Sequence, residues 1–138
     1  MTGKHVALTL VVAAALCAWL WRSPPEAWTA LRIAGLVLIV LGFVLWTIAR
    51  FQLGASFAVG AEARRLVTLG LYRRIRNPIY LFGSWVLAGV MLVAGKPLWL
   101  LAFVVLIPVQ VWRARKESAV LEGAFGEQYR KYRAGTWF

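Results

Sequence analysis

"NPIYLFGSWVLAGVMLVAGKPLWLLAFVVLIPVQVW", residues 77–112, contains two apolar segments separated by one short polar connection. The first segment covers residues 79–95 and the second covers residues 97–112. The Gly-Lys-Pro sequence at 95–97 allows only a tight turn, so the two segments are predicted to form an antiparallel helical hairpin. Such a hairpin brings the start of its first helix and the end of its second helix to the same side of the protein.

Two further apolar segments precede this hairpin, at residues 6–21 and 30–49. Crossing a bilayer takes roughly 20 residues, so the segments at 6–21 and 97–112 need flanking tryptophan and arginine anchors. The 138-residue chain is 62% hydrophobic with a mean hydropathy of +0.72, well above the usage of soluble domains. The sequence therefore predicts an all-α, polytopic membrane protein with four transmembrane helices in a single domain over residues 1–138.

The charge of the chain is strongly basic, with 16 Lys and Arg against 5 Asp and Glu and a net charge of +11. These residues flank the apolar segments and form no continuous stripe, which favours membrane lipids over nucleic acid as the partner. Thirteen of the 16 lie before the first segment, between residues 50 and 78, or after Trp112. The positive-inside rule then places both termini in the cytoplasm, and a bacterial inner membrane is the expected location.

The segment after the hairpin, residues 113–132, is polar but keeps a helical pattern, with Leu121, Phe125, Tyr129 and Tyr132 at helical spacing. It is predicted to be a C-terminal cytoplasmic amphipathic helix that lies on the membrane or over the hairpin.

The start of the hairpin reads "RNPIY", residues 76–80. Asn77 is a favoured N-cap residue, and Pro78 suits the first helical position, where its missing N–H is not needed. The free N–H groups of the first turn and the helix dipole form an anion site that Arg76 reinforces. Tyr80 lies at the same opening.

Arg113 and Glu117 are one turn apart where the second hairpin helix ends. Because of the hairpin, they are predicted to face the "RNPIY" segment across a cytoplasmic pocket. Two simpler readings remain open, a positive-inside anchor for the arginines and an i,i+4 surface pair for Arg113 and Glu117. Cys17 and His5 are the only cysteine and histidine, so the sequence predicts no metal site.

Small residues within the hairpin suggest close helix packing. Ser84 and Ala88 form a small-xxx-small pair that would let a neighbouring helix approach closely. This spacing permits a dimer without requiring one, so the oligomeric state stays open.

The stretches "RRLVTLGLYRRIRNPIY" (64–80) and "RARKESAVLEGAFGEQYRKY" (113–132) flank the hairpin. In this order they resemble the superfamily of isoprenylcysteine carboxyl methyltransferases and phospholipid methyltransferases, membrane enzymes that use S-adenosyl-L-methionine. The resemblance covers roughly residues 50–133. The chain departs from the family pattern at Asn77, where histidine is frequent, and at Ser118, where a second glutamate is usual.

The resemblance implies the roles of individual residues. Together with Arg76, the expected cofactor contacts are Arg65, Leu66, Val67, Tyr72, Asn77, Pro78, Ile79, Tyr80 and Glu117. Arg113 falls where the isoprenylcysteine enzymes place a substrate-facing arginine. Arg113 and Asn77 are therefore the candidate catalytic residues.

The implied function is methyl transfer from S-adenosyl-L-methionine to a lipophilic acceptor at the cytoplasmic membrane face. An isoprenylcysteine-like carboxylate and a phospholipid-like headgroup are both compatible with Arg113. Two other functions remain open: a membrane reductase that uses NADPH, and a scaffold that has lost catalysis, which the departures at Asn77 and Ser118 would favour.

Overall fold

The computed structural model describes residues 2–54 and 66–138, and these ranges are helical apart from loops and one isolated β-bridge. The α-helices are α1 (Thr2–Arg22), α2 (Ala30–Leu53), α3 (Pro78–Val93), α4 (Phe103–Phe125) and α5 (Glu127–Ala134). Two 3₁₀ helices, η2 (Gly70–Arg73) and η3 (Pro97–Ala102), precede α3 and α4. The predicted all-α class is confirmed.

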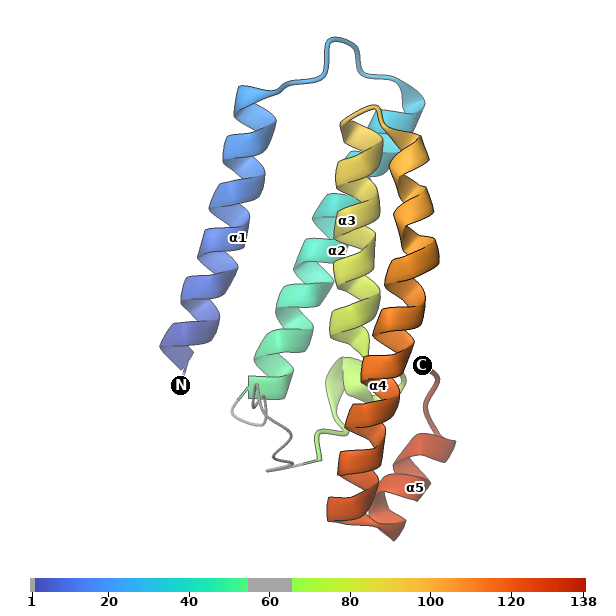
Figure 1. Ribbon diagram of the computed structural model, residues 1–138. Helices are drawn as coiled ribbons and strands as arrows, with labels where there is room; N and C mark the ends of the chain where they lie inside the picture. Colours follow the sequence, from blue (N-terminus) through green and yellow to red (C-terminus); the bar gives the residue numbers. More distant parts are fainter. Residues whose placement is uncertain (1, 55–65) are drawn as a thin grey trace.

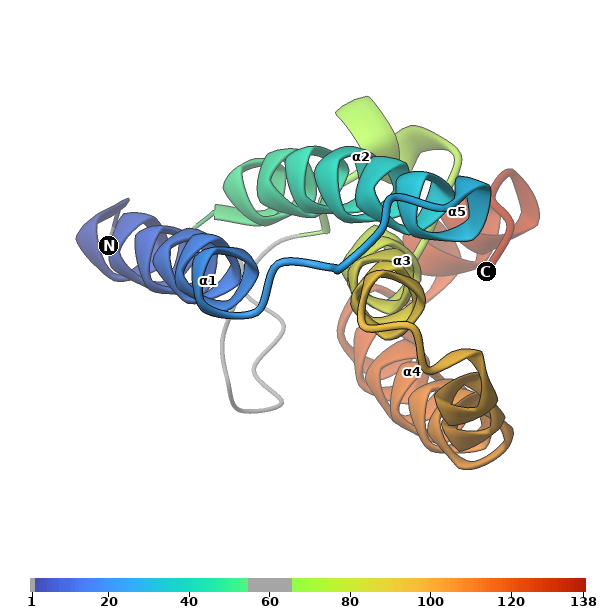
Figure 2. The same ribbon diagram turned by 90° about the horizontal axis from the view of Figure 1, so that it is seen from above.

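The long helices run side by side in an elongated bundle (Figure 1). Seen from above, α3 lies between α2 and α4, while α1 stands beyond α2 (Figure 2). None of the described side chains of α1 is buried, whereas α2 and α3 bury residues along their shared face. The α2–α3 pair is therefore the packed centre of the bundle.

Glycines allow α2 and α3 to approach at backbone distance. A Cβ atom placed on Gly89 of α3 would lie 2.5 Å from the carbonyl oxygen of Gly35 on α2, and one on Gly42 would lie 3.0 Å from the carbonyl of Phe82. This contact does not use Ser84, whose Oγ lies 3.1 Å from Gln110 Oε1 on α4 instead. Ser84 thus links α3 to α4 by a hydrogen bond.

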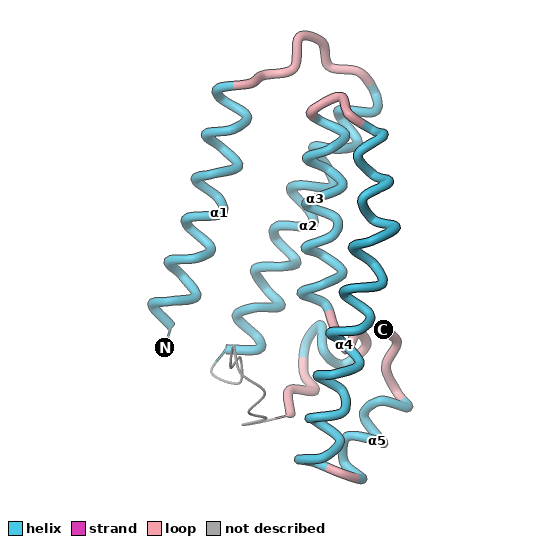
Figure 3. The backbone as a smooth tube through the Cα atoms, in the orientation of Figure 1, coloured by secondary structure: helices cyan, strands magenta, loops and turns pink. Residues whose placement is uncertain are grey.

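The hairpin of α3 and α4 differs from the expected one at its second half. Residues 97–102 form η3, and α4 then continues past Trp112 to Phe125 without a break (Figure 3). No glycine or proline interrupts residues 112–122, so nothing ends the helix at Trp112, where the apolar segment ends. The separate tail helix expected at 113–132 was therefore wrong: its first half belongs to α4, which ends at Gly126 (φ +50°), and only α5 follows as a distinct helix.

Within residues 2–54 and 66–138, two helical stretches are long and apolar enough to cross a membrane, Ala30–Leu53 and Pro97–Phe125. Only 17% and 6% of their most apolar windows are buried inside the protein, unlike the core helices of a soluble domain. The apolar parts of α1 and α3, Val6–Arg22 and Pro78–Val93, are shorter. Length and composition thus support two crossings, whereas the sequence predicted four.

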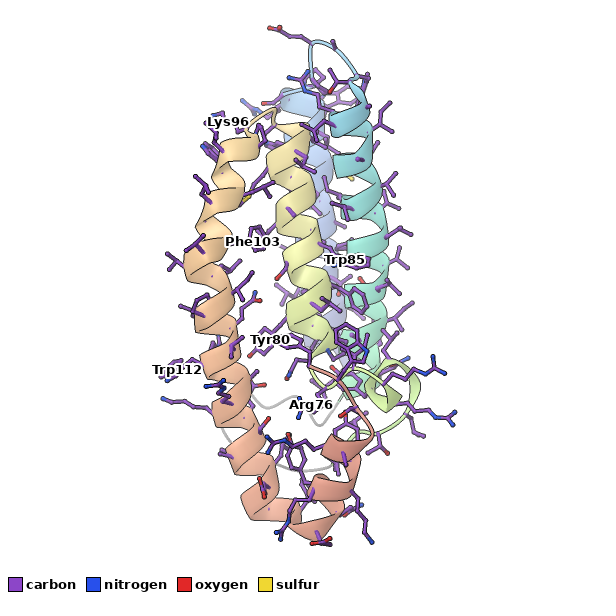
Figure 4. All side chains as sticks on the ribbon, turned by 90° about the vertical axis from the view of Figure 1, so that its right-hand side faces the viewer. Arg76, Tyr80, Trp85, Lys96, Phe103 and Trp112 are labelled. Carbon is purple, nitrogen blue, oxygen red and sulfur yellow. The ribbon has the colours of Figure 1, made fainter. Side chains whose placement is uncertain are left out.

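One end of the bundle carries the functional candidates. The N-terminus, the end of α2, the start of α3 and the lower half of α4 all lie at this end (Figure 1). The turn between α3 and η3, which contains Lys96, lies at the opposite end from Arg76 (Figure 4).

Candidate functional site

The start of α3 and the lower half of α4 meet through Tyr80 and Glu117. The Tyr80 hydroxyl donates a hydrogen bond to Glu117 Oε1 at 2.5 Å. Arg113, one turn before Glu117 on α4, places its guanidinium carbon 5.9 Å from the centre of the Tyr80 ring. In Figure 4, Tyr80 lies on the side of α3 that faces α4, with Arg76 near the same end. The structure therefore brings together the two polar groups that the hairpin predicted to face each other.

The first turn of α3 differs in detail from the expected cap. Pro78 occupies the first helical position, as predicted, and its side chain is fully buried. Asn77 occupies the N-cap position, but its side chain makes no capping hydrogen bond, so the predicted capping role is wrong. The first N–H to bond within the helix is that of Leu81, to the Asn77 carbonyl at 3.2 Å. In the described ranges the N–H groups of Ile79 and Tyr80 have no acceptor, which leaves them available to an anion.

Tyr72 lies in η2, and its side chain is 5% exposed. Its hydroxyl oxygen is buried and has no hydrogen-bond partner among the residues that the structure describes. Burial first, and then the neighbouring Tyr132 and Glu117, raise the pKa of Tyr72 above its ordinary value. The hydroxyl therefore stays protonated at neutral pH and can donate a hydrogen bond to a ligand.

Arg76 is the second buried donor near this end of α3. Its Nε atom is buried without a hydrogen-bond partner in the described part of the chain. Burial and then Tyr129 raise the pKa of Tyr132 to about 12, while the charge of nearby Arg76 acts in the opposite direction. Arg76, Tyr72 and Tyr132 are thus electrostatic neighbours, and the cluster contains two donors that no described residue satisfies.

The remaining predicted cofactor contacts have less definite roles. Leu66 and Val67 are half-buried in the irregular segment that precedes η2, and Ile79 is half-buried in the first turn of α3. Arg65 lies outside the described residues.

Three residues that shape the site were not among the predicted ones. Gln52 of α2 accepts a hydrogen bond from the Leu71 N–H at 2.8 Å and so holds the start of η2. The Tyr132 hydroxyl donates to the Tyr72 carbonyl at 2.7 Å, and Trp137 forms a parallel β-bridge with Ile75. The spacing of Tyr129 and Tyr132 was a signal in the sequence that pointed to Tyr132. The contacts of Trp137 are made by its backbone, so its residue type does not indicate them.

The arrangement suits a small molecule that carries charges of both signs. Glu117 offers an anionic acceptor, Arg76 and the first turn of α3 offer donors for an anion, and Tyr72 and Tyr80 offer aromatic rings beside them. Arg113 is exposed and can reach a second, anionic molecule next to the first.

A comparison with protein families agrees with this chemistry. The model of the family described as phospholipid methyltransferase matches residues 30–128, from the first residue of α2 to the first turn of α5. No individual curated protein and no solved structure gives a significant match. The matched range includes η2, the start of α3 and the Arg113–Glu117 turn, and it covers most of the chain. The chain therefore belongs to the phospholipid methyltransferase family.

Proposed function

We propose that the protein transfers a methyl group from S-adenosyl-L-methionine to a lipophilic acceptor at the cytoplasmic face of the membrane. In this proposal α1, α2, α3 and the apolar part of η3–α4 all cross the bilayer, and both termini are cytoplasmic. Family membership supports the reaction class. The two long apolar helices and the basic residues at the site end of the bundle support the membrane placement.

The observation that carries the proposal is a pair of buried donors, Tyr72 Oη and Arg76 Nε, that have no hydrogen-bond partner among the described residues. Leaving such groups unsatisfied costs about 1–3 kcal/mol each, so their retention beside a charged cluster favours a ligand that satisfies them. The carboxylate of S-adenosyl-L-methionine suits Arg76 and the free N–H groups of Ile79 and Tyr80. Its ammonium or ribose diol suits Glu117, and its sulfonium suits the ring of Tyr80 or Tyr72.

The cofactor supplies a methyl group already activated by the positive sulfur, so the protein's task is chiefly alignment. Glu117 and the Tyr80 hydroxyl orient each other through their hydrogen bond. Asn77, whose amide is not used for capping, remains able to contact the acceptor. The only histidine of the chain is His5, which is not among the proposed site residues, so we assign no histidine base, and an acceptor that is already deprotonated, or a neutral amine, fits best.

Arg113 is proposed to bind the acceptor's anionic group, because it lies beside Tyr80 and projects from the exposed part of α4. A guanidinium matches a carboxylate and a phosphate equally well in geometry. The isoprenylcysteine-like carboxylate and the phospholipid-like headgroup are therefore both retained as acceptor classes.

Calorimetric titration of the purified protein in detergent tests the cofactor site. Wild type should bind S-adenosyl-L-methionine, and Glu117→Gln should bind at least about tenfold more weakly, as expected when a charge-assisted bond worth about 1.5–3 kcal/mol is lost. Glu26→Gln is the matched control, because it also neutralises one carboxylate but lies in the exposed loop between α1 and α2, at the opposite end of the bundle (Figure 1). A folded wild type that ignores the cofactor would refute the proposal.

Two comparisons separate the alternatives. A larger thermal stabilisation by NADPH than by S-adenosyl-L-methionine would identify a reductase. A protein that binds neither, and whose cofactor-site variants leave cells unaffected, would be a scaffold.

A labelling experiment identifies the acceptor class. Incubation of the protein with methyl-labelled cofactor and total membrane lipid should place the label in a lipid or in a prenylated product.

A further inference from the structure

The last residues of the chain lie alongside the segment that leads into α3. The N–H of Trp137 donates to the Arg74 carbonyl at 2.9 Å, and the Trp137 carbonyl accepts from the N–H of Arg76 at 3.2 Å. The Asn77 N–H donates to the Phe138 carbonyl at 2.9 Å. The two bonds of Trp137 form the parallel β-bridge between Ile75 and Trp137, and the Phe138 bond lies next to it. The C-terminus consequently lies beside the start of α3 (Figure 1).

A second attachment lies five residues before Trp137. The Tyr132 hydroxyl donates to the Tyr72 carbonyl at 2.7 Å, across a separation of 60 residues. Thr136 Oγ1 donates back to the Tyr132 carbonyl at 3.1 Å, which connects the two attachments. Residues 132–138 are called the C-terminal clamp below.

The clamp is itself held by α4. Tyr129, in α5, is 1% exposed and anchors this short helix. Arg133 lies 3.9 Å from Glu122 of α4. The clamp is thus linked to the end of α4, which also carries Glu117.

The clamped segment, residues 72–77, carries Tyr72, Arg76 and Asn77. It comprises the end of η2 and the connection to α3, so no α-helix of its own orders it. The N–H groups of Arg76 and Asn77 precede α3 and receive their acceptors from the clamp. Ordering such a segment costs conformational entropy. Because the clamp orders the segment when the protein folds, a ligand that binds there does not have to supply this free energy.

We propose that the C-terminal clamp positions residues 72–77 for cofactor binding, with the backbone of Trp137 and the hydroxyl of Tyr132 as its two attachment points. The proposal rests on the proposed cofactor site. It assigns no contact with the cofactor to Trp137, whose side chain is 58% exposed. The clamp connects the loop before α3 to the end of α4. It thereby fixes residues 72–77 relative to Glu117, the part of the site that α4 carries.

Trp137→Pro tests the backbone attachment, because proline replaces the N–H that donates to Arg74 with a ring carbon directed at the same oxygen. Trp137→Ala is the matched variant, since it removes only an exposed side chain and keeps the amide. Tyr132→Phe removes the other attachment while keeping the ring. All three are purified in detergent and compared with wild type by thermal unfolding, amide hydrogen exchange and cofactor titration.

In Trp137→Pro the amides of Arg76 and Asn77 should exchange faster than in wild type. In this variant a smaller fraction of molecules should have residues 72–77 in the conformation that binds the cofactor. The apparent affinity falls with that fraction, so the Kd for S-adenosyl-L-methionine should rise about fivefold to tenfold. The KM for the cofactor should rise likewise, with kcat at saturation nearly unchanged. Trp137→Ala should resemble wild type, and Tyr132→Phe should show a smaller rise in Kd.

Faster exchange at Arg76 and Asn77 in Trp137→Pro, with an unchanged Kd, would refute the proposed role of the clamp. The proposed cofactor site would be unaffected by that result. Unchanged exchange in Trp137→Pro would overturn the role of the clamp as well. If wild type itself fails to bind the cofactor, the proposed function fails instead, which the same titration shows directly. Should Trp137→Pro not fold, Tyr132→Phe decides, and a wild-type Kd and KM in that variant would count against the clamp.

Discussion

Tyr72 combines two properties that conflict in a protein without a ligand. Its ring is buried, while its hydroxyl is buried without a partner in the described ranges. A residue kept only for packing would serve better as phenylalanine, because a buried polar group without a hydrogen bond destabilises the fold. The hydroxyl is therefore best explained by a ligand.

Tyr72→Phe should change stability and binding in opposite directions. The ligand-free protein should become more stable by about 1 kcal/mol, since an unsatisfied group is removed. Affinity for S-adenosyl-L-methionine should fall about tenfold, as for the loss of one buried hydrogen bond. Thermal unfolding in detergent and calorimetric titration measure the two effects. A variant that loses both stability and affinity would show that the hydroxyl is structural.

Substitutions of Tyr80 separate its hydroxyl from its ring. Tyr80→Phe loses the bond to Glu117 but keeps the aromatic face beside Arg113, so cofactor affinity should fall severalfold. Tyr80→Ala loses both and should bind more weakly still, because a cation beside a desolvated ring is worth about 2 kcal/mol. Equal losses in the two variants would mean that the ring makes no contribution.

At the scale of elements, the α2–α3 pair depends on glycine. Gly35 and Gly89 face each other so closely that a Cβ on Gly89 would lie 2.5 Å from a backbone oxygen and 2.8 Å from a side-chain carbon of Ile39. Backbone cannot move aside as a flexible side chain does, so any larger residue must separate the helices. Because α3 carries Pro78 and Tyr80 at its start, a shift of α3 also moves the site.

Gly89→Ala should destabilise the protein by about 1–3 kcal/mol, the usual cost of overpacking, despite the better helix propensity of alanine. Gly83→Ala is the control in the same helix: there a Cβ would lie 3.7 Å from Trp46, an ordinary contact. That variant should be unchanged or stabilised by about 0.5–1 kcal/mol. Thermal unfolding in detergent compares the two, and equal melting temperatures would contradict the glycine packing.

At the scale of the whole molecule, the distribution of charge relates the bundle to the membrane. Arg73, Arg74 and Arg76 lie at the site end, as do the basic residues of α5, whereas Lys96 lies at the other end beside Trp99, with its ammonium 4.2 Å from the ring. Aromatic rings and basic side chains at both ends are typical of interfacial anchors. With α3 shorter than the usual span of roughly 20 residues, such anchors would have to complete its crossing.

Cysteine labelling in intact bacterial cells tests the four-crossing arrangement. In a Cys17→Ser background, Lys96→Cys should react with a membrane-impermeant maleimide from outside the cell. Arg73→Cys should react only after the cytoplasmic side is opened. Both positions are exposed in the structure, so accessibility to solvent is not limiting. Reaction of both from the same side would show that α3 does not cross the membrane.

Local features of the sequence determined the helices and the facing of Tyr80 and Glu117. Long apolar segments indicate where the helices form, and a Gly-Lys-Pro turn allows only an antiparallel hairpin between two of them. Once the hairpin exists, the first turn of α3 and the lower half of α4 must be neighbours. The boundary at Trp112 failed because it was drawn from polarity, while helix continuity depends on stop signals, and Gly126 supplies the one that ends α4.

Only the tertiary structure decided how the loop before α3 is held and how closely α2 and α3 pack. The bonds from Trp137 and Phe138 to residues 74–77 are made by backbone atoms, which every residue possesses, so no side-chain pattern announces them. The Tyr132–Tyr72 bond and the Gly35–Gly89 contact each join helices or loops far apart in the chain. Periodicity describes one element at a time, and pairings between distant elements follow from the packed arrangement of the whole chain.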